Sequence, residues 1–449
     1  MNPIEGLKGE VLWRGQAGYE EARVGTVWNA RKPDRYPSLI VRAADADDVA
    51  IAVRYAVSND LAVRARSGGH NWNASSIRDD AMLIDLGHLA DVTVDTTTRR
   101  VSLGPAIRGN VLQQILHDKG LFFPTGHCST VAMGGFLLQG GLGWQMRRLG
   151  LANEGVRAID VVTATGEQIT ASATENEDYF WAARGSHAGF FGIITRYHLE
   201  AQPRPEIHAN TYLFSRQDTE SVLRWAVPAA ASLDPHVEVS GIAMPGLTNV
   251  GPPGTFFMLS FIAFTETAEQ GIALLRAIDG DSAVLDTALV REVAQPSSIQ
   301  AMYDGTDQIY IEGLRFNVDN MYTSASDDDV VSALLDTMSD IPTPMPHVLW
   351  SPFPENVPGK DTQISILGNH YIALYGASFD PADDDSTRKW STEHMRATEH
   401  ISDGMQLGDE NLIQRPHARI LAGDAERRLE ELRTKYDPDG RFLSYLRGS

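Results

Sequence analysis

Two glycine-rich stretches carry the side chains that are best suited to take part in chemistry. The first runs from Arg66 to Asn73, reads RSGGHNWN, and follows a run of strand-like residues. Its Ser67-Gly68-Gly69 turn can aim successive backbone N–H groups at an anion such as a pyrophosphate, because glycine frees the backbone from Cβ constraints. A plain tight turn followed by an ordinary hydrogen-bonded histidine, His70, fits the same residues.

The second stretch holds six glycines in the eighteen residues from Gly126 to Gly143, together with Cys128, the only cysteine of the chain. Such a density of glycine predicts close approach of the backbone to a bound group. The spacing matches neither the dinucleotide fingerprint G-x-G-x-x-G, nor a P-loop, nor a G-x-S-x-G nucleophile elbow. One cysteine allows no internal disulfide, so Cys128 is either a small buried hydrophobe or a solitary reactive group.

Composition narrows the class of protein. With 449 residues, 43% of them hydrophobic, the chain can bury two cores, and we expect two domains. The formal charge of −21 repels phosphate backbones and anionic lipid headgroups, which argues against nucleic acid and membrane partners. Neither a signal peptide pattern nor an apolar run of ~20 residues is present, so we expect a cytoplasmic protein.

Short strands alternate with helices over the first 200 residues, which indicates an α+β layout. The helix at 47–58 places Val49, Val53 and Val57 on one face, and Asp45 or Asp47 can cap its start. The other expected helices lie at 110–119, 177–183, 218–233, 268–278, 328–338 and 416–436. The expected strands include 38–42, 61–66, 82–86, 91–95, 100–103, 158–164, 167–170, 192–199, 256–264 and 371–375. Two prolines in Gln202-Pro203-Arg204-Pro205 break regular structure and mark a domain boundary.

Taken together, these motifs resemble the berberine bridge enzyme-like flavoproteins, which share the vanillyl-alcohol oxidase type of FAD-binding fold. The resemblance is found in VRARSGGHN, GHCSTVAMGGFLLQGGLGW, GLANEGVRAIDVVTATGE and DYFWAARG, and it returns at KYDPDGRF. It implies a two-domain α+β fold. We expect an FAD-binding domain at 1–204, a substrate domain at 205–410 built on an antiparallel sheet covered by helices, and a C-terminal return to the FAD-binding domain at 411–449.

The resemblance further implies an FAD held by two covalent bonds. His70 stands where the family's histidine bonds the flavin 8-methyl carbon, and Cys128 where its cysteine bonds C6. Cys128 also precedes an expected helix start, whose dipole would favour the reactive thiolate. Val131 matches a position that controls oxygen access in some relatives, where valine favours oxidase behaviour. The other expected cofactor-binding residues are Arg66, Ser67, Gly68, Gly69, Asn71, Met133, Gly134, Gly135, Gly140, Gly143, Asn153, Val156 and Ile193.

The catalytic base is less plainly marked. Sugar-oxidising members of the family carry a Y-x-N-Y-x-D element, and the corresponding stretch here, GMQLGD at 404–409, lacks both tyrosines. Alternation along the strand at 369–375 places Tyr371 and Tyr375 on one face. If that face meets the flavin, either tyrosine could orient or deprotonate substrate, although packing in a half-buried sheet fits them equally. Further polar candidates are Asp307, Tyr310 and Tyr322.

The sequence thus predicts an FAD-dependent oxidase. Its small organic substrate, of aromatic, alkaloid-like or glycosidic type, would lose a hydride from an alcohol or amine carbon, and O2 would be reduced to H2O2. No metal is expected, because the histidines lack spacing such as H-E-x-x-H. Two alternatives remain: a flavin dehydrogenase that uses another electron acceptor, and a non-catalytic flavin-binding protein that has kept the fold.

Overall fold

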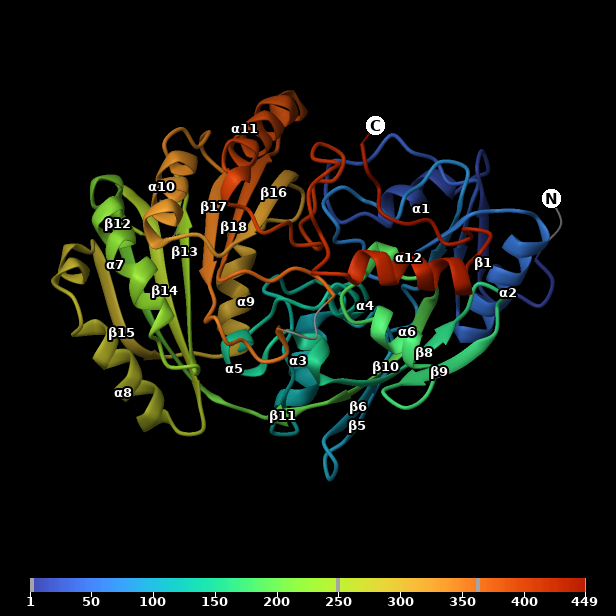
Figure 1. Cartoon of the computed structure of the whole chain (residues 1–449), viewed down its shortest axis with the longest axis horizontal. Coiled ribbons are helices and arrows are strands. Elements are labelled where there is room, and N and C mark those ends of the chain that lie inside the picture. The colour runs from blue at the N-terminus through green and yellow to red at the C-terminus, as the bar shows by residue number, and fades with distance from the viewer. Residues whose placement is uncertain (1–3, 248–250, 361–363, 449) are drawn as a thin grey trace.

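The computed structural model describes residues 4–247, 251–360 and 364–448. One half of the molecule is built on two sheets near the N-terminus and the other on a seven-stranded sheet, with short helices between them (Figure 1). Helices and largely antiparallel strands are mixed along the chain, so the expected α+β class is confirmed. No described helix combines the length and the apolar character needed to cross a bilayer.

The first half contains a four-stranded and a five-stranded sheet. The four-stranded sheet has the order β1 (Glu10–Trp13), β2 (Leu39–Arg42), β4 (Met82–Asp85) and β3 (Val63–Arg66), with only β1 antiparallel. The five-stranded antiparallel sheet has the order β5 (Val92–Asp95), β6 (Arg100–Leu103), β10 (Ile193–Glu200), β8 (Val156–Val162) and β9 (Gln168–Ser172). A small sheet pairs β7 (Leu121–Phe122) with β11 (Gln202–Pro203). The helices are α1 (Tyr19–Gly25), α2 (Ala46–Ser58), α3 (Gly109–His117), α4 (Met133–Leu138), α5 (Met146–Leu149) and α6 (Glu177–Ala182).

Helix α2 illustrates how local sequence sets these elements. The Asp45 side chain accepts a hydrogen bond from the Asp48 backbone N–H at 3.1 Å and so caps the helix start, as expected. Val49 and Val53 are fully buried, whereas Val57 is 43% exposed, so the prediction of a shared face is wrong at Val57. Eight residues at 3.6 per turn rotate Val57 by about 80° from Val49, which carries it off the buried face.

The second half is one antiparallel sheet covered by helices on one face. Its order is β15 (Val290–Pro296), β12 (Glu206–Ser215), β14 (Thr255–Thr265), β13 (Val237–Ala243), β17 (His347–Pro352), β18 (His370–Ser378) and β16 (Arg315–Thr323). The covering helices are α7 (Thr219–Ala231), α8 (Ala268–Asp279), α10 (Asp327–Met338) and α11 (Asp384–Ala397). Helix α9 (Ile299–Asp307) lies toward the first half, next to α3 and α5 in Figure 1.

Alternation along β18 divides its side chains between two cores. Ile372 and Leu374 pack beneath the covering helices. Tyr371, Ala373 and Tyr375 point to the opposite face, where they meet residues of the first half such as Trp72. This is the division that the alternation predicts, and it turns the two tyrosines toward the middle of the molecule.

The C-terminal segment packs against the first half. Helix α12 (Ala425–Tyr436) buries Leu429 and Leu432 in the core of the five-stranded sheet, and Tyr436 stacks on Phe191 with ring centroids 5.5 Å apart. The helix expected at 416–436 is wrong over residues 416–424, which form turns and irregular structure that include Pro416.

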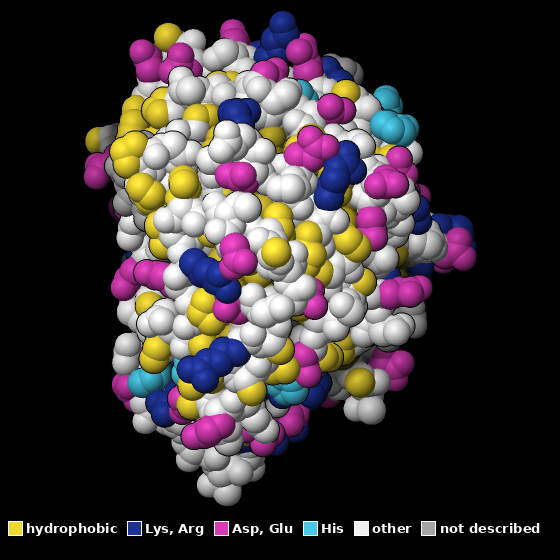
Figure 2. All heavy atoms as spheres, turned by 90° about the vertical axis from the view of Figure 1, so that its left-hand side faces the viewer, with side chains coloured by type: hydrophobic (Ala, Val, Ile, Leu, Met, Phe, Trp, Pro, Cys, Tyr) yellow, Lys and Arg dark blue, Asp and Glu magenta, His cyan; other side chains and the backbone are white. Residues whose placement is uncertain are grey.

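The outer end of the seven-stranded sheet is an open edge. Strand β15 is largely exposed, and its Arg291 forms ion pairs with Asp279 at 2.8 Å and with Asp286. Figure 2 views the molecule from this end and shows acidic and basic side chains interspersed with apolar ones. Charges along an exposed edge strand oppose its pairing with another chain.

Candidate active site

A cavity of about 600 Å³ lies between the two halves of the molecule. Its walls come from the 64–72 and 126–147 segments of the first half, from the helix-free face of the seven-stranded sheet, from α9 and from residues 406–409. The volume falls in the ordinary range of small-molecule sites, about 300–1,000 Å³. Segments distant in sequence therefore converge on one internal space.

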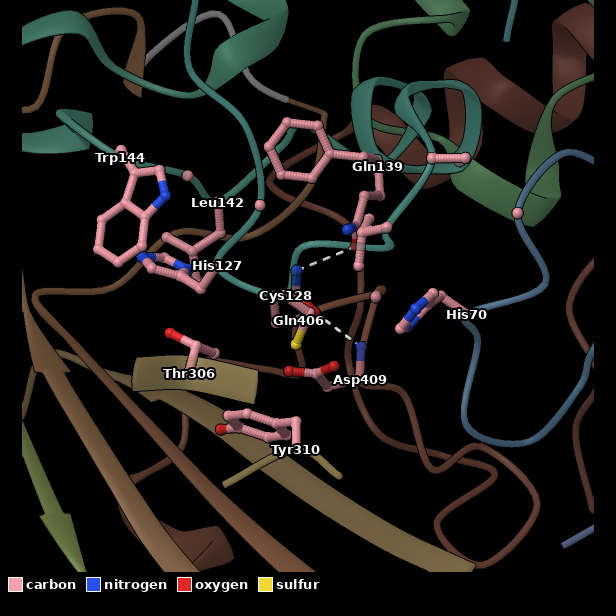
Figure 3. A pocket seen from close by; sticks show the side chains of 18 of the residues that line it. His70, His127, Cys128, Gln139, Leu142, Trp144, Thr306, Tyr310, Gln406 and Asp409 are labelled. Carbon is pink, nitrogen blue, oxygen red and sulfur yellow. Dashed lines mark hydrogen bonds between the residues drawn. The ribbon is translucent and has the colours of Figure 1, made fainter. Parts of the chain in front are cut away.

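His70 and Cys128 both line this cavity, although they come from different loops (Figure 3). The His70 imidazole stacks on Trp28 with ring centroids 4.4 Å apart, and its Nε2 lies 2.8 Å from the Thr130 hydroxyl. Burial, reinforced by two nearby arginines, lowers the pKa of His70 to about 3. The imidazole is therefore neutral at ordinary pH and keeps a lone pair that can act as a nucleophile.

The environment of Cys128 differs from the expected one. Helix α4 begins at Met133, so Cys128 is too far from its N-terminus to benefit from the helix dipole. Burial, together with the carboxylates of Asp409 and Asp307, raises the pKa of the Cys128 thiol. The prediction of a helix-stabilised thiolate is therefore wrong, and the thiol is protonated at neutral pH.

Helix α9 holds the Cys128 loop from the side of the sheet. The Tyr303 hydroxyl lies 2.7 Å from the Thr125 hydroxyl, and the Ser129 hydroxyl donates to the Asp307 carboxylate at 2.7 Å. These two contacts flank Cys128 on either side along the chain. A helix of the second half thus fixes the position of the thiol from the first half.

Asp409 is the focus of a buried polar cluster beside Cys128 (Figure 3). Its Oδ2 accepts hydrogen bonds from the hydroxyls of Tyr371 and Tyr375, the latter at 3.0 Å, and its Oδ1 accepts one from the Trp72 indole N–H at 2.5 Å. Burial and the Asp409 charge raise the pKa of both tyrosines. Both phenols therefore stay protonated and donate to one carboxylate.

Glutamine and asparagine side chains fix Asp409 in turn. Gln406 accepts from the Asp409 backbone N–H at 2.8 Å and donates to Gln139 at 2.9 Å, the two bonds dashed in Figure 3. Asn320 donates to the Asp409 carbonyl at 2.7 Å. Sequence reasoning missed the role of Asp409, although the residue occupies the final position of the Y-x-N-Y-x-D element at 404–409 and could have been noted there.

Most of the expected site residues reach the cavity. Those that line it are Arg66, Ser67, Gly68, Gly69, His70, Asn71, Cys128, Val131, Gly134, Gly135, Gly143, Ile193, Tyr371 and Tyr375. Of the three further polar candidates, Tyr310 lines it, whereas Asp307 and Tyr322 stand behind its wall. Four expected cofactor residues lie outside the lining, namely Met133, Gly140, Asn153 and Val156.

The side chains of two of these residues, Arg66 and Asn71, already form hydrogen bonds or ion pairs with other residues of the chain. The Arg66 guanidinium pairs with Asp85 at 2.8 Å and donates to the Thr26 carbonyl at 3.0 Å. The Asn71 side chain donates to Glu410 at 3.3 Å and accepts from the Ser75 backbone N–H at 2.9 Å. These two side chains therefore shape the cavity wall, and a bound group would meet them with part of their hydrogen-bonding capacity already used.

The chemistry of the cavity fits a flavin nucleotide. A Cβ added to Gly135 would have only Ser67 Oγ, at 3.9 Å, as a neighbour within 4 Å, so this glycine leaves room along the wall. Elsewhere in the cavity lining, Arg64 Nε and His187 Nδ1 are buried and have no hydrogen-bond partner among the described residues. Unpartnered nitrogen atoms of this kind suit the oxygen atoms of a bound nucleotide.

Comparisons with known proteins agree with this geometry. Residues 37–172 match the family model described as an FAD binding domain. The chain is 30% identical over 442 residues to the FAD-linked oxidoreductase janO of Penicillium janthinellum, covering 96% of both chains. It is 29% identical over 321 residues to the (R)-6-hydroxynicotine oxidase of Paenarthrobacter nicotinovorans, covering 68% of this chain and 67% of that one.

The solved structures show the same fold. The 6-hydroxy-D-nicotine oxidase of Arthrobacter nicotinovorans superimposes with a TM-score of 0.83 at 21% identity, over 98% of this chain and 97% of that one. The fold and the relatives together define an FAD-dependent oxidoreductase. The chain belongs to the berberine bridge enzyme-like FAD-linked oxidoreductases, and its FAD-binding fold is of the vanillyl-alcohol oxidase type.

Proposed function

We propose that this FAD-dependent oxidoreductase is an oxidase whose FAD is held covalently by both His70 and Cys128. It would oxidise an alcohol or amine carbon of a small organic molecule and reduce O2 to H2O2. The observation that carries the proposal is the convergence of one neutral imidazole and the only thiol of the chain on a single cavity. The division into domains at 1–204, 205–410 and 411–449 is part of the same proposal.

The two attachment residues differ in the proton transfer that each would need before it reacts. When the Nε2–H of the neutral His70 imidazole donates to the Thr130 hydroxyl, the lone pair on Nδ1 is free to react. The Cys128 thiol must lose its proton before it can react. Asp409 is the carboxylate with the largest electrostatic effect on this thiol, and it is the natural group to receive the proton.

Asp409 and the two tyrosines would also accept the proton that the substrate loses. The bound FAD supplies the hydride acceptor. Because Tyr371 and Tyr375 both donate to Asp409, the lone pairs of their oxygens remain available to accept from a substrate hydroxyl or amine. The raised tyrosine pKa disfavours a free phenolate, so the tyrosine would pass its own proton to Asp409 as it receives that of the substrate.

The relative named as an oxidase and the position of Val131 support O2 as the electron acceptor. Val131 lines the cavity three residues after Cys128, where a valine was expected to favour oxidase behaviour. The competing function is a dehydrogenase that passes electrons to another acceptor. Stopped-flow measurement of flavin reoxidation in air-saturated buffer separates the two, because only an oxidase should be reoxidised rapidly by O2. An oxidase should also release about one H2O2 per substrate oxidised.

Acid precipitation tests the two attachments. We expect a yellow pellet from the wild-type protein and from His70→Ala and Cys128→Ala singly, because one bond remains in each. The double variant should give a colourless pellet and a yellow supernatant. The spectrum of Cys128→Ala should differ from that of the wild type, because it lacks sulfur on the ring. A colourless wild-type pellet would overturn double attachment.

A further inference from the structure

A row of hydroxyl groups crosses the cavity face of the seven-stranded sheet. Thr211 of β12 faces Ser260 of β14, which faces Ser240 of β13. Gly241 pairs with Trp350, and this register continues to Ser351 of β17 beside Ser240. Ser351 in turn faces Tyr371 of β18. Five neighbouring strands thus contribute one hydroxyl each at the same level, and all five residues line the cavity.

The four serine and threonine hydroxyls are free for a ligand. None of the side chains of Thr211, Ser240, Ser260 and Ser351 makes a hydrogen bond to another described residue. Each side chain is only partly buried, so its hydroxyl faces the cavity. Each can donate one hydrogen bond and accept others.

Apolar side chains run beside this row at the next level of the sheet. Met258, Ile242, Leu349 and Ala373 are paired across the same strands and belong to the apolar cluster that contains Tyr371. On the other side, Ile262 of β14 pairs with both Ala209 and Glu238. The sheet therefore presents a polar line with a continuous apolar band on one side. On the other side the Glu238 carboxyl, which accepts from the Met146 backbone N–H at 2.7 Å, lies beside Ile262.

The row begins at Tyr371, where the substrate is proposed to react, and extends away from it across the sheet. Tyr371 donates to Asp409, while Thr211 lies four strands further on. At about 4.8 Å between strands, the row extends for about 19 Å, which is longer than a single aromatic ring or a single sugar. A compact substrate held at Tyr371 would leave most of the row without a partner.

We propose that this hydroxyl row binds the distal part of an extended substrate that has an apolar body and several oxygen atoms along one edge. This inference rests on the proposed function, because it places the reacting end of the substrate at Tyr371. The apolar band covers the body of the substrate, and the hydroxyls of Ser351, Ser240, Ser260 and Thr211 pair with successive hydroxyl, ether or carbonyl oxygens.

The test compares two probes that differ only in their oxygen atoms. One is benzyl alcohol extended at the para position by a tri(ethylene glycol) ether chain, and the other carries an all-carbon chain of equal length. Binding is measured by equilibrium dialysis to holoenzyme whose flavin has first been reduced with dithionite under anaerobic conditions, so that the probe alcohol cannot be oxidised. The proteins are the wild type, the double variant Ser240→Ala/Ser260→Ala, and Ser332→Ala on the exposed face of α10 as control.

We expect the double variant to bind the ether probe about 10- to 30-fold more weakly, as two lost hydrogen bonds of ~1 kcal/mol each imply. Binding of the all-carbon probe should change less than about 2-fold, and Ser332→Ala should match the wild type with both. Equal changes for the two probes, or no binding of the ether probe to the wild type, would overturn the inference. If the selective loss occurs but no alcohol or amine yields H2O2, the hydroxyl row stands and the oxidase proposal fails.

Discussion

At the scale of single residues, Asp409 is the group on which the proposed proton transfer depends. Its carboxylate accepts from Tyr371, Tyr375 and Trp72, which fixes the orientation of both phenols. In Asp409→Asn an amide NH2 must face one of these donors and can accept no proton. We expect substrate-driven flavin reduction to slow by about 10²- to 10⁴-fold, as the loss of a general base does, in protein whose flavin remains attached through His70.

Anaerobic stopped-flow spectroscopy measures this rate directly. The exposed Asp424 at the start of α12 provides a matched control, because Asp424→Asn removes an equal charge outside the cavity lining. An unchanged rate in Asp409→Asn, or an equal loss in both variants, would remove Asp409 from the proposed mechanism.

Glu410, next to Asp409, makes stability depend on pH. Burial raises the pKa of its carboxyl from 4.5 to about 7. Because the folded protein then binds the proton more tightly than the unfolded chain, the contribution is fully present below pH 4.5 and is lost as pH rises through about 7. A shift of this size corresponds to roughly 3 kcal/mol.

Glu410→Gln should abolish this pH dependence, since the amide resembles the protonated acid. Urea unfolding at pH 5 and pH 8 would show a smaller fall in the free energy of unfolding for the variant than for the wild type. Glu430→Gln on the exposed face of α12 should retain the wild-type fall. A variant that loses as much stability as the wild type between these pH values would contradict the assignment.

Candidate residues in local motifs and on one strand face were predictable, whereas contacts between residues distant in sequence were not. His70 and Cys128 stand in short glycine-rich stretches whose sequence carries the signal. Tyr371 and Asp409 are 38 positions apart, and only the sheet and the 404–409 segment bring them together. The raised pKa of Cys128 has the same origin, because the burial and the acidic neighbours that cause it come from the tertiary fold.

At the scale of elements, α7, α8 and α10 on the seven-stranded sheet were found from the sequence, whereas α9 and α11 were not. Helix α10 begins at Asp327, is capped by Ser326 and packs several apolar residues against the sheet, a pattern that periodicity reveals. Helix α9 is capped by Ser298, but it has only nine residues and a single buried side chain, Tyr303, so it offers few apolar positions from which to predict a helix. Its importance comes from the loop that it contacts.

The contact between α9 and the Cys128 loop gives a prediction about flavin attachment. Tyr303→Phe removes the hydrogen bond to Thr125 and about 1 kcal/mol of loop positioning, equivalent to a ~5-fold change in the population of the attached geometry. Under the proposed double attachment, we expect part of the purified variant to carry flavin bound through His70 alone. Mass spectrometry of flavin-containing peptides measures this fraction.

Tyr436→Phe is the control for this experiment. It also removes a tyrosine hydrogen bond, to Asp178 at 2.8 Å, but on α12 away from the cavity. Its flavin should remain fully attached to both residues. Complete double attachment in Tyr303→Phe would show that α9 does not position the thiol.

At the scale of the whole molecule, the two halves are joined by buried polar contacts as well as by the cavity. The Asp319 and Arg415 side chains form an ion pair at 2.8 Å that ties β16 to the C-terminal segment. Met405 and Leu407 pack in the core of the five-stranded sheet, although they precede residue 410 in the chain. The chain therefore returns to the first half before the proposed boundary at residue 410.

Asn29 is the clearest of these links. Its amide donates to the carbonyls of Trp72 and Phe316, both at 2.9 Å, and accepts from the Phe316 backbone N–H at 3.0 Å. Asn29→Ala removes one hydrogen-bond partner from each of these backbone groups, and the Phe316 carbonyl keeps only the Arg31 guanidinium, at 3.2 Å, as a side-chain donor. We expect the free energy of unfolding to fall by about 2–4 kcal/mol and the melting temperature by several degrees.

Because such contacts couple the halves, calorimetry should record one unfolding transition in the wild type and in Asn29→Ala. Asn59→Ala, which removes an exposed hydrogen bond to the Tyr55 carbonyl, should change the free energy of unfolding by less than about 0.5 kcal/mol. Two separate transitions in the wild-type protein would contradict this coupling. The seven-stranded sheet would then unfold independently of the rest, and the cavity would be a contact between two self-sufficient domains.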